Sequence, residues 1–134
     1  MALVVVTGPI IRAGESLSEG LDLSSGELLR LTMPLDWTPA PLSFQLSSDG
    51  KQYSDAFHLS GFEVSMTTVV PNSVVVVPYD VGRAIAWLKV RSGTRDKPIP
   101  QEADRTFAID ISTSTGKPSS GWVRCYGWMW AQVP

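Results

Sequence analysis

Ten prolines and eleven glycines are spread along the whole of this 134-residue chain, and they limit its possible folds more than any other feature. Proline removes a backbone donor and glycine is costly to order, so both interrupt helices. Few windows between them are long enough for an amphipathic helix. Short strands bounded by turns remain, and the sequence therefore predicts an all-β protein.

Alternation of apolar and polar residues marks the predicted strands. Residues 42–47 read Leu-Ser-Phe-Gln-Leu-Ser and residues 106–112 read Thr-Phe-Ala-Ile-Asp-Ile-Ser, so each segment has one apolar and one polar face. That pattern is typical of half-buried antiparallel strands. Eight or nine such strands predict an antiparallel β-sandwich of jelly-roll type, with an immunoglobulin-like sandwich as the alternative. The remaining predicted strands are residues 3–7, 21–23, 27–33, 62–70, 73–77, 84–91 and 122–130.

Two of these strands carry a further prediction. In residues 27–33 the alternation places Leu29, Leu31 and Met33 on the core side. Residues 84–91 fit either a helical turn or a strand. We favour a strand, because basic and apolar residues alternate at its end.

Composition divides the chain into four predicted segments. Residues 1–12 form an N-terminal extended strand or arm, in which Gly8-Pro9 ends the predicted strand of residues 3–7, and residues 13–112 form the β-sandwich domain. Residues 113–121 are polar and contain glycine and proline, as linkers do. Residues 122–134 form an aromatic C-terminal strand or arm.

The C-terminal segment has an unusual concentration of large aromatic residues. In a single strand over residues 122–130, one face carries Trp122, Tyr126, Trp128 and Trp130. Two interpretations stay open at this point. The segment is either the last core strand of the sandwich or an arm that docks on a partner's sheet edge or groove.

Composition also excludes several classes of function. A net charge of −2 argues against nucleic acid and anionic membranes as partners. One cysteine rules out an internal disulfide, and one histidine with one cysteine does not furnish the usual zinc ligands. No segment resembles a signal peptide or a membrane span, so we expect synthesis in the cytoplasm. Because the chain has so few ligand side chains of these kinds, we also expect no cofactor and no metal.

Candidate chemistry along the chain is sparse. His58 has no Gly-x-Ser-x-Gly nucleophile to accompany it, and Cys125 lies in an aromatic strand typical of an inert thiol. Asp49 and Asp55 offer oxygen ligands for calcium, but the dense acidic loop of a calcium site is missing, so a solvated turn is favoured. We expect a protein that is not an enzyme.

The connection from residue 91 to residue 105 carries charges of both signs. Such a connection is usually a solvated face. Its arginines Arg91, Arg95 and Arg105 are also suited to pair with carboxylates of a neighbouring subunit. We therefore name them as candidate contact residues, together with the four aromatic residues of the C-terminal segment.

Two stretches of the chain resemble known proteins. Residues 42–53, a strand followed by a Ser-x-Asp-Gly turn and an aromatic residue, look like part of a galactose-binding-like (discoidin-type) jelly roll. Short ordered motifs at residues 13–18, 33–40, 44–50, 88–94 and 100–105 are together similar to a family of small proteins encoded among the structural genes of tailed bacteriophages and prophages. This second resemblance covers roughly residues 13–112 and implies a component of the virion.

The leading hypothesis is therefore a phage virion structural protein, in particular a capsid decoration or cement protein. Its expected partners are the major capsid protein or other virion proteins and further copies of itself, and its expected location is the virion. The alternative is a carbohydrate-binding module, or a tail, neck or fibre component with the same fold. For the carbohydrate alternative, the candidate ligand-facing residues are Trp37, Tyr53 and Asp49.

Overall fold

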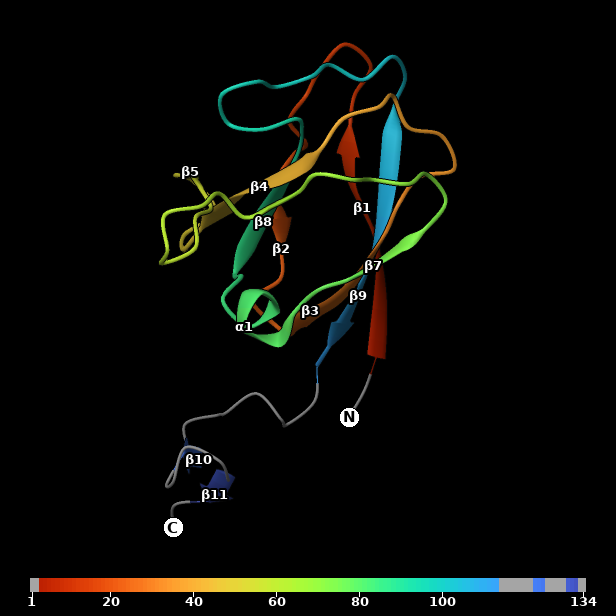
Figure 1. Cartoon of the computed structure of the whole chain (residues 1–134). Coiled ribbons are helices and arrows are strands. Elements are labelled where there is room, and N and C mark those ends of the chain that lie inside the picture. The colour runs from red at the N-terminus through yellow and green to blue at the C-terminus, as the bar shows by residue number, and fades with distance from the viewer. Residues whose placement is uncertain (1–2, 114–121, 125–129, 133–134) are drawn as a thin grey trace.

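The computed structural model describes residues 3–113, together with the backbone of residues 122–124 and 130–132, and it has the predicted all-β sandwich architecture (Figure 1). Every strand pair is antiparallel. The first sheet runs in the order β1 (Leu3–Ile11), β9 (Arg105–Ser112), β3 (Glu27–Thr32) and β7 (Val74–Val76). The second runs in the order β2 (Leu21–Asp22), β8 (Trp87–Ser92), β4 (Leu42–Ser47) and β5 (Ser54–Asp55), with β6 (Ser65–Met66) also paired to β4.

The hydrophobic core lies between the two sheets. The alternation predicted for β9 is confirmed, because Phe107, Ile109 and Ile111 are all buried. From the facing sheet, Leu88 and Val90 of β8 are fully buried, which also confirms that this segment is a strand. Burial of these large side chains is the main favourable term in the stability of the sandwich.

The N-terminal strand is longer than expected and belongs to the sandwich. It continues past Gly8-Pro9 and pairs with β9 from Leu3 to Ile11, so it is not a separate arm. Between Thr7 and Ile10, β1 advances three residues while β9 advances two. Gly8-Pro9, which was expected to end the strand, instead forms a β-bulge. Gly8 adopts a φ of +119°, and Pro9, which has no backbone N–H, lies where the regular ladder is interrupted.

A second irregularity changes which leucines of β3 face the core. The register between β3 and β9 shifts between Leu28 and Arg30, so that two residues of β3 match one of β9. Leu28 and Leu31 are buried as a result, whereas Leu29 is only half-buried. The core position predicted for Leu29 is therefore wrong, because a bulge breaks the period of two.

The middle of the chain is less regular than expected. Of the strand predicted over residues 62–70, only β6 forms, and the chain then crosses from the second sheet to β7 on the first (Figure 1). A short helix, α1 (Tyr79–Gly82), follows Pro78. One helical turn is too short to leave a period in the sequence, so the pattern of residues does not predict it.

The C-terminal segment is not one strand. Its residues form β10 (Trp122–Arg124) and β11 (Trp130–Gln132), which pair antiparallel with each other in a two-stranded sheet of their own. The predicted single strand over residues 122–130 is therefore wrong, because the chain reverses between the two.

Candidate interaction surface

An apolar cleft opens between the edges of the two sheets. Its volume is about 440 Å³, and its floor includes core leucines of both sheets, Leu31, Leu42 and Leu88. Residues 74–78 form one wall and residues 64–66 the other. Only His58 and Ser65 bring polar side chains to the lining. The volume lies in the range of ligand pockets, and the cleft gives a neighbour's apolar groups access to the core.

The wall formed by β7 is also a sheet edge. The backbone bonds from Val77 N–H to Leu29 O and from Met33 N–H to Ser73 O join β7 to β3. In an antiparallel pair these bonds alternate, so the peptide groups of Val74 and Val76 point away from β3. Among the described residues, no strand lies beyond β7. This edge is therefore a row of unpaired donors and acceptors.

A second hollow extends the cleft along α1 toward β5. It has a volume of about 360 Å³ and shares several lining residues with the first, among them Phe44, Val64 and Ile85. Asp55 and Asp80 are the two carboxylates that line it. The two hollows together make one groove, which is lined by apolar residues beside β7 and whose two carboxylates both belong to the second hollow.

An apolar turn of residues 57–62 lies at the rim of this groove, which two of its residues, Phe57 and His58, line. The turn is closed by hydrogen bonds from His58 N–H to Phe62 O at 2.8 Å and from Gly61 N–H to His58 O at 2.9 Å. Its large side chains face solvent, since Leu59 is fully exposed and Phe62 is 76% exposed. Apolar residues gathered on one exposed turn beside an apolar cleft are typical of an interaction site.

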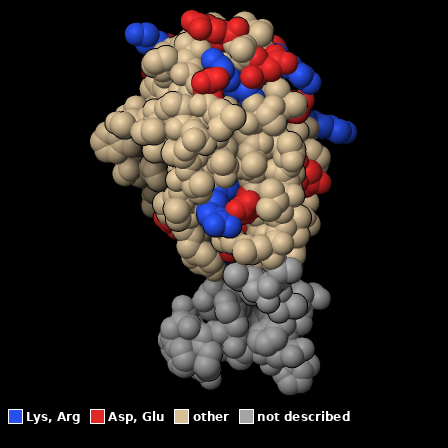
Figure 2. All heavy atoms as spheres, turned by 90° about the vertical axis from the view of Figure 1, so that its right-hand side faces the viewer, with Lys and Arg blue, Asp and Glu red and all other residues tan. Residues whose placement is uncertain are grey.

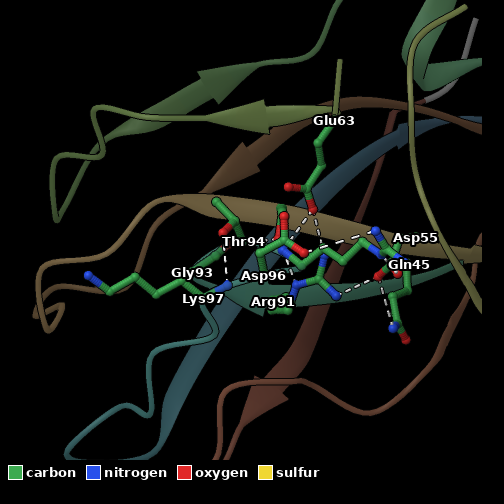
Figure 3. Close-up of polar contacts among 10 residues, drawn as sticks. Gln45, Asp55, Glu63, Arg91, Gly93, Thr94, Asp96 and Lys97 are labelled. Carbon is green, nitrogen blue, oxygen red and sulfur yellow. Dashed lines mark hydrogen bonds and ion pairs between the residues drawn. The ribbon is translucent and has the colours of Figure 1, made fainter. Parts of the chain in front are cut away.

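Arg91 anchors the apolar turn to the second sheet (Figure 3). Its guanidinium donates to Asp55 at 2.6 Å and to Glu63 at 2.7 Å, and its Nε donates to Ser43 at 2.8 Å. The two carboxylates flank the turn in sequence, so one buried arginine fixes both of its ends. Every donor of this cluster that lies in the interior is satisfied, which is what makes a buried ion pair tolerable.

The charges of this cluster set the ionisation of Asp55. The hydrogen bond from Arg91 holds the pKa of Asp55 below its ordinary value of 3.8, and burial acts in the opposite direction. Arg95 adds a second cation, with its Nε 3.2 Å from the other oxygen of Asp55. Its backbone N–H donates to Glu63 at 3.0 Å. Both carboxylates that flank the turn are therefore bound by the same two arginines.

The candidate contact arginines have different environments. Arg91 is 6% exposed and is committed to carboxylates of its own chain, so it is not free to bind a neighbour. Arg105 donates to the side chains of Gln101 at 3.0 Å and Thr38 at 3.2 Å, which fixes a loop of the sandwich. Arg95 is more than half exposed and remains accessible. Only one of the three arginines therefore presents an accessible surface.

The candidate ligand-facing residues do not form one site. Trp37 is 8% exposed, packs edge-on against Phe107 with ring centroids 5.7 Å apart, and donates to Ala40 O at 3.1 Å. It is a core residue, which corrects the prediction that it faces a ligand. Asp49 accepts hydrogen bonds from its own turn, and the Gln52 and Lys51 amides lower its pKa.

Tyr53 is half-buried, with the ammonium of Lys89 4.5 Å from its ring centroid. Of the predicted aromatic contacts, Trp122 and Trp130 fall in β10 and β11, whose backbone alone is described. Tyr126 and Trp128 lie outside the described residues, as do the linker residues 114–121.

Sequence reasoning missed the cleft and its rim. The run of four valines over residues 74–77 fits the strand predicted there but does not indicate which of its residues are exposed, and Val74 and Val76 are exposed. The signal in the apolar turn is plainer: three large apolar residues are crowded around a glycine, where turns normally carry polar groups.

Figure 2 shows the side of the molecule on which β1, β7 and β9 lie in Figure 1. Charged side chains gather at one end of this face, and uncharged residues cover most of its middle. The exposed large apolar residues of β1 and β7 are Leu3, Val4, Val5, Val74 and Val76.

Comparisons with protein-family models, with curated proteins and with solved structures find no match to this chain. Within the part of the chain that the structure describes, no three or more His, Cys, Asp or Glu residues are grouped to hold a metal ion. No helix there has the length and apolar character needed to cross a membrane.

Proposed function

We propose that the protein is a structural subunit of a tailed-phage particle, a decoration or cement protein that binds the capsid shell and neighbouring subunits. The observation that carries the contact role is the surface formed by the cleft, the free edge of β7 and the apolar turn of residues 57–62. The virion as its place is supported by the resemblance of residues 13–112 to proteins encoded among phage structural genes.

The strand order supports a jelly roll. With β5 and β6 counted as one strand position beside β4, the sheets run β1-β9-β3-β7 and β2-β8-β4-β5, and β1 to β4 alternate between them. Jelly rolls place their eight strands in this order, and many viral capsid domains are built on that fold. Fold alone does not assign a function, so this observation supports the proposal without carrying it.

Weak contacts suffice for a protein of this kind. A shell presents the same binding site many times, so neighbouring subunits that also touch one another gain avidity without any single strong contact. Removing the apolar turn from water contributes on the order of 25 cal/mol per Å² of apolar area. The proposal assigns no catalysis and no cofactor to the chain.

The test uses particles of the phage whose genome encodes the chain. Particles made without the gene are expected to lack a regular surface density on the shell in electron microscopy, and added protein is expected to restore it. Unchanged shells contradict the proposal. A change confined to the tail or neck, or binding to glycans but not to shells, contradicts the decoration role.

A matched pair of variants locates the contact. The double substitution Leu59→Ser and Phe62→Ser removes the exposed apolar groups of the turn, and we expect it to weaken shell binding by about tenfold or more. Leu35→Ser is the control, because Leu35 is 75% exposed but lies in another loop, outside the apolar turn. Equal binding by the double variant and the control contradicts a role for the turn.

A further inference from the structure

We propose that the C-terminal strand pair of a second copy of this chain, residues 122–132, adds to the first sheet by pairing one of its strands with the free edge of β7. The inference rests on the proposed function, because it names one of the neighbouring subunits that the apolar surface binds. In this mode of recognition the backbone of a sheet edge supplies hydrogen bonds, and adjacent pockets take alternate side chains.

The backbone of β7 meets the first requirement. Val74 and Val76 direct their peptide groups away from β3, so an incoming strand finds donors and acceptors at alternate residues. The strand pair of β10 and β11 also offers backbone groups for pairing, since in a two-stranded sheet each strand keeps one edge that its partner does not use. Edge-to-edge addition thus extends the first sheet and leaves the pairing of β10 with β11 in place.

The cleft meets the second requirement. It lies directly beside β7, it is about 440 Å³ in volume, and His58 and Ser65 are the only polar side chains that line it. Residues 122–132 contain the chemistry that such a cleft takes, because Tyr126, Trp128 and Trp130 are large and mainly apolar and tolerate a polar rim. The lining contains no carboxylate or basic side chain apart from His58, so neither sign of charge is favoured.

The path of the chain brings this segment to the correct end of β7. Strand β9 ends at Ser112, opposite Glu27 at the start of β3, and β7 ends on the same side because Val76 lies opposite Arg30. The nine residues 113–121 span at most about 30 Å when extended. A linker of this length is long enough for the segment to reach a neighbouring subunit. Because both copies leave from the same place, a two-fold pair exchanges segments reciprocally.

A proline substitution tests the added strand. The N–H of Val76 points away from β3, so Val76→Pro removes a donor from the free edge and spares the pairing of β7 with β3. We expect the full-length chain to self-associate in sedimentation experiments and Val76→Pro to weaken that association by about tenfold or more. Val76→Thr, which keeps the N–H and the β-branched shape, is the control and retains association. Association unchanged by proline overturns the proposal.

A disulfide test identifies the occupant. Cys125 is the only cysteine and lies within the incoming segment, and Ser65 is an exposed residue on the opposite wall of the cleft. In the full-length Ser65→Cys variant we expect mild oxidation to join the introduced thiol of one chain to Cys125 of another, as found by mass spectrometry of the cross-linked peptide. The exposed control Ser48→Cys, and the Ser65→Cys variant that also carries Cys125→Ser, do not give this disulfide. A disulfide only within one chain overturns the second copy as occupant.

Failure of this inference differs from failure of the proposed function. A full-length chain that stays monomeric but still decorates shells overturns the added strand and leaves the decoration role intact. A chain that self-associates through β7 but leaves shells bare supports the added strand and contradicts decoration.

Discussion

At the scale of single residues, Arg91 organises the region beside the cleft. Its side chain leaves the polar face of β8 but is covered by the segment that carries Asp55 and Glu63, so its charge is paired in the interior. Around Arg91 the outer face of this sheet is therefore a buried polar layer and not a solvated one. The apolar turn stays in place because its two flanking carboxylates share one cation.

Loss of Arg91 is expected to be costly. Arg91→Met removes the buried cation from two largely buried carboxylates, which then keep only their weaker contacts to Arg95 and Gln45, and we expect a loss of about 3 kcal/mol in the free energy of unfolding. Arg12→Met removes an exposed partner of Asp104 and is expected to cost less than about 1 kcal/mol. Urea unfolding measures both. Equal losses in the two variants contradict a buried role for Arg91.

The same cluster predicts a dependence on pH. The folded pKa of Asp55 is lowered, so its ionised form stabilises the fold above the ordinary value of 3.8, and this contribution disappears as pH falls through the folded pKa. We expect the difference in unfolding free energy between the wild type and Asp55→Asn to be constant near neutral pH and to shrink below about pH 4. A difference that persists unchanged at lower pH contradicts the assignment.

Sequence alone predicts that Arg91 lies on the polar face of a strand, but not that this face is covered. Alternation reports which side of a strand avoids water, and it carries no information about a distant segment that folds over the other side. Residues 54–66 are such a segment. The same limit applies to Trp37, which the sequence offers as a ligand-facing residue although its ring packs on Phe107.

At the scale of elements, the strands are largely predictable and their irregularities are not. The strand β4 has the predicted bounds, and β9 differs by one residue at its start. The bulges in β1 and β3 depend on how β9 lies between them, so the register shifts at Thr7 and Leu28 are properties of the pairing. The alternation within a segment identifies a strand with one apolar face. The strands that pair with it decide where bulges occur, and therefore which of its residues face the core.

The turn after β4 gives the element-scale prediction. Gly50 has a φ of +77°, and a Cβ at this position meets the Trp87 ring at 2.8 Å, whereas Gly14 has a φ of +83° and open space around it. We expect Gly50→Ala to destabilise the protein by about 1–3 kcal/mol more than Gly14→Ala, because only the first adds a clash to the backbone cost. Chemical denaturation of both variants measures the difference, and equal losses contradict the ring contact.

At the scale of the whole molecule, the order of the strands is beyond prediction from the residues alone. The first and last strands of the sandwich are neighbours, and β3 lies between β9 and β7, so most pairings join distant parts of the chain. The open cleft is a consequence of that order. It forms where β7 and β6, the ends of two different sheets, face each other without a closing strand among the described residues.

The chemistry of the surface predicts how association responds to salt. The cleft and the apolar turn carry few charges, and the chain has a net charge of only −2. Contacts made by apolar burial and backbone hydrogen bonds are little screened, whereas contacts through exposed arginines weaken as ionic strength rises. We therefore expect the dissociation constant for self-association to change by less than about threefold between roughly 0.05 and 0.5 M sodium chloride.

Arg95 provides the internal control for this prediction, because it is the one candidate contact arginine with an exposed guanidinium. If the apolar surface carries association, Arg95→Gln leaves both the dissociation constant and its response to salt unchanged. Sedimentation at several salt concentrations measures both quantities for the two proteins. Association that weakens steeply with salt, and loses that response in Arg95→Gln, places the contact on the arginine connection instead of the cleft.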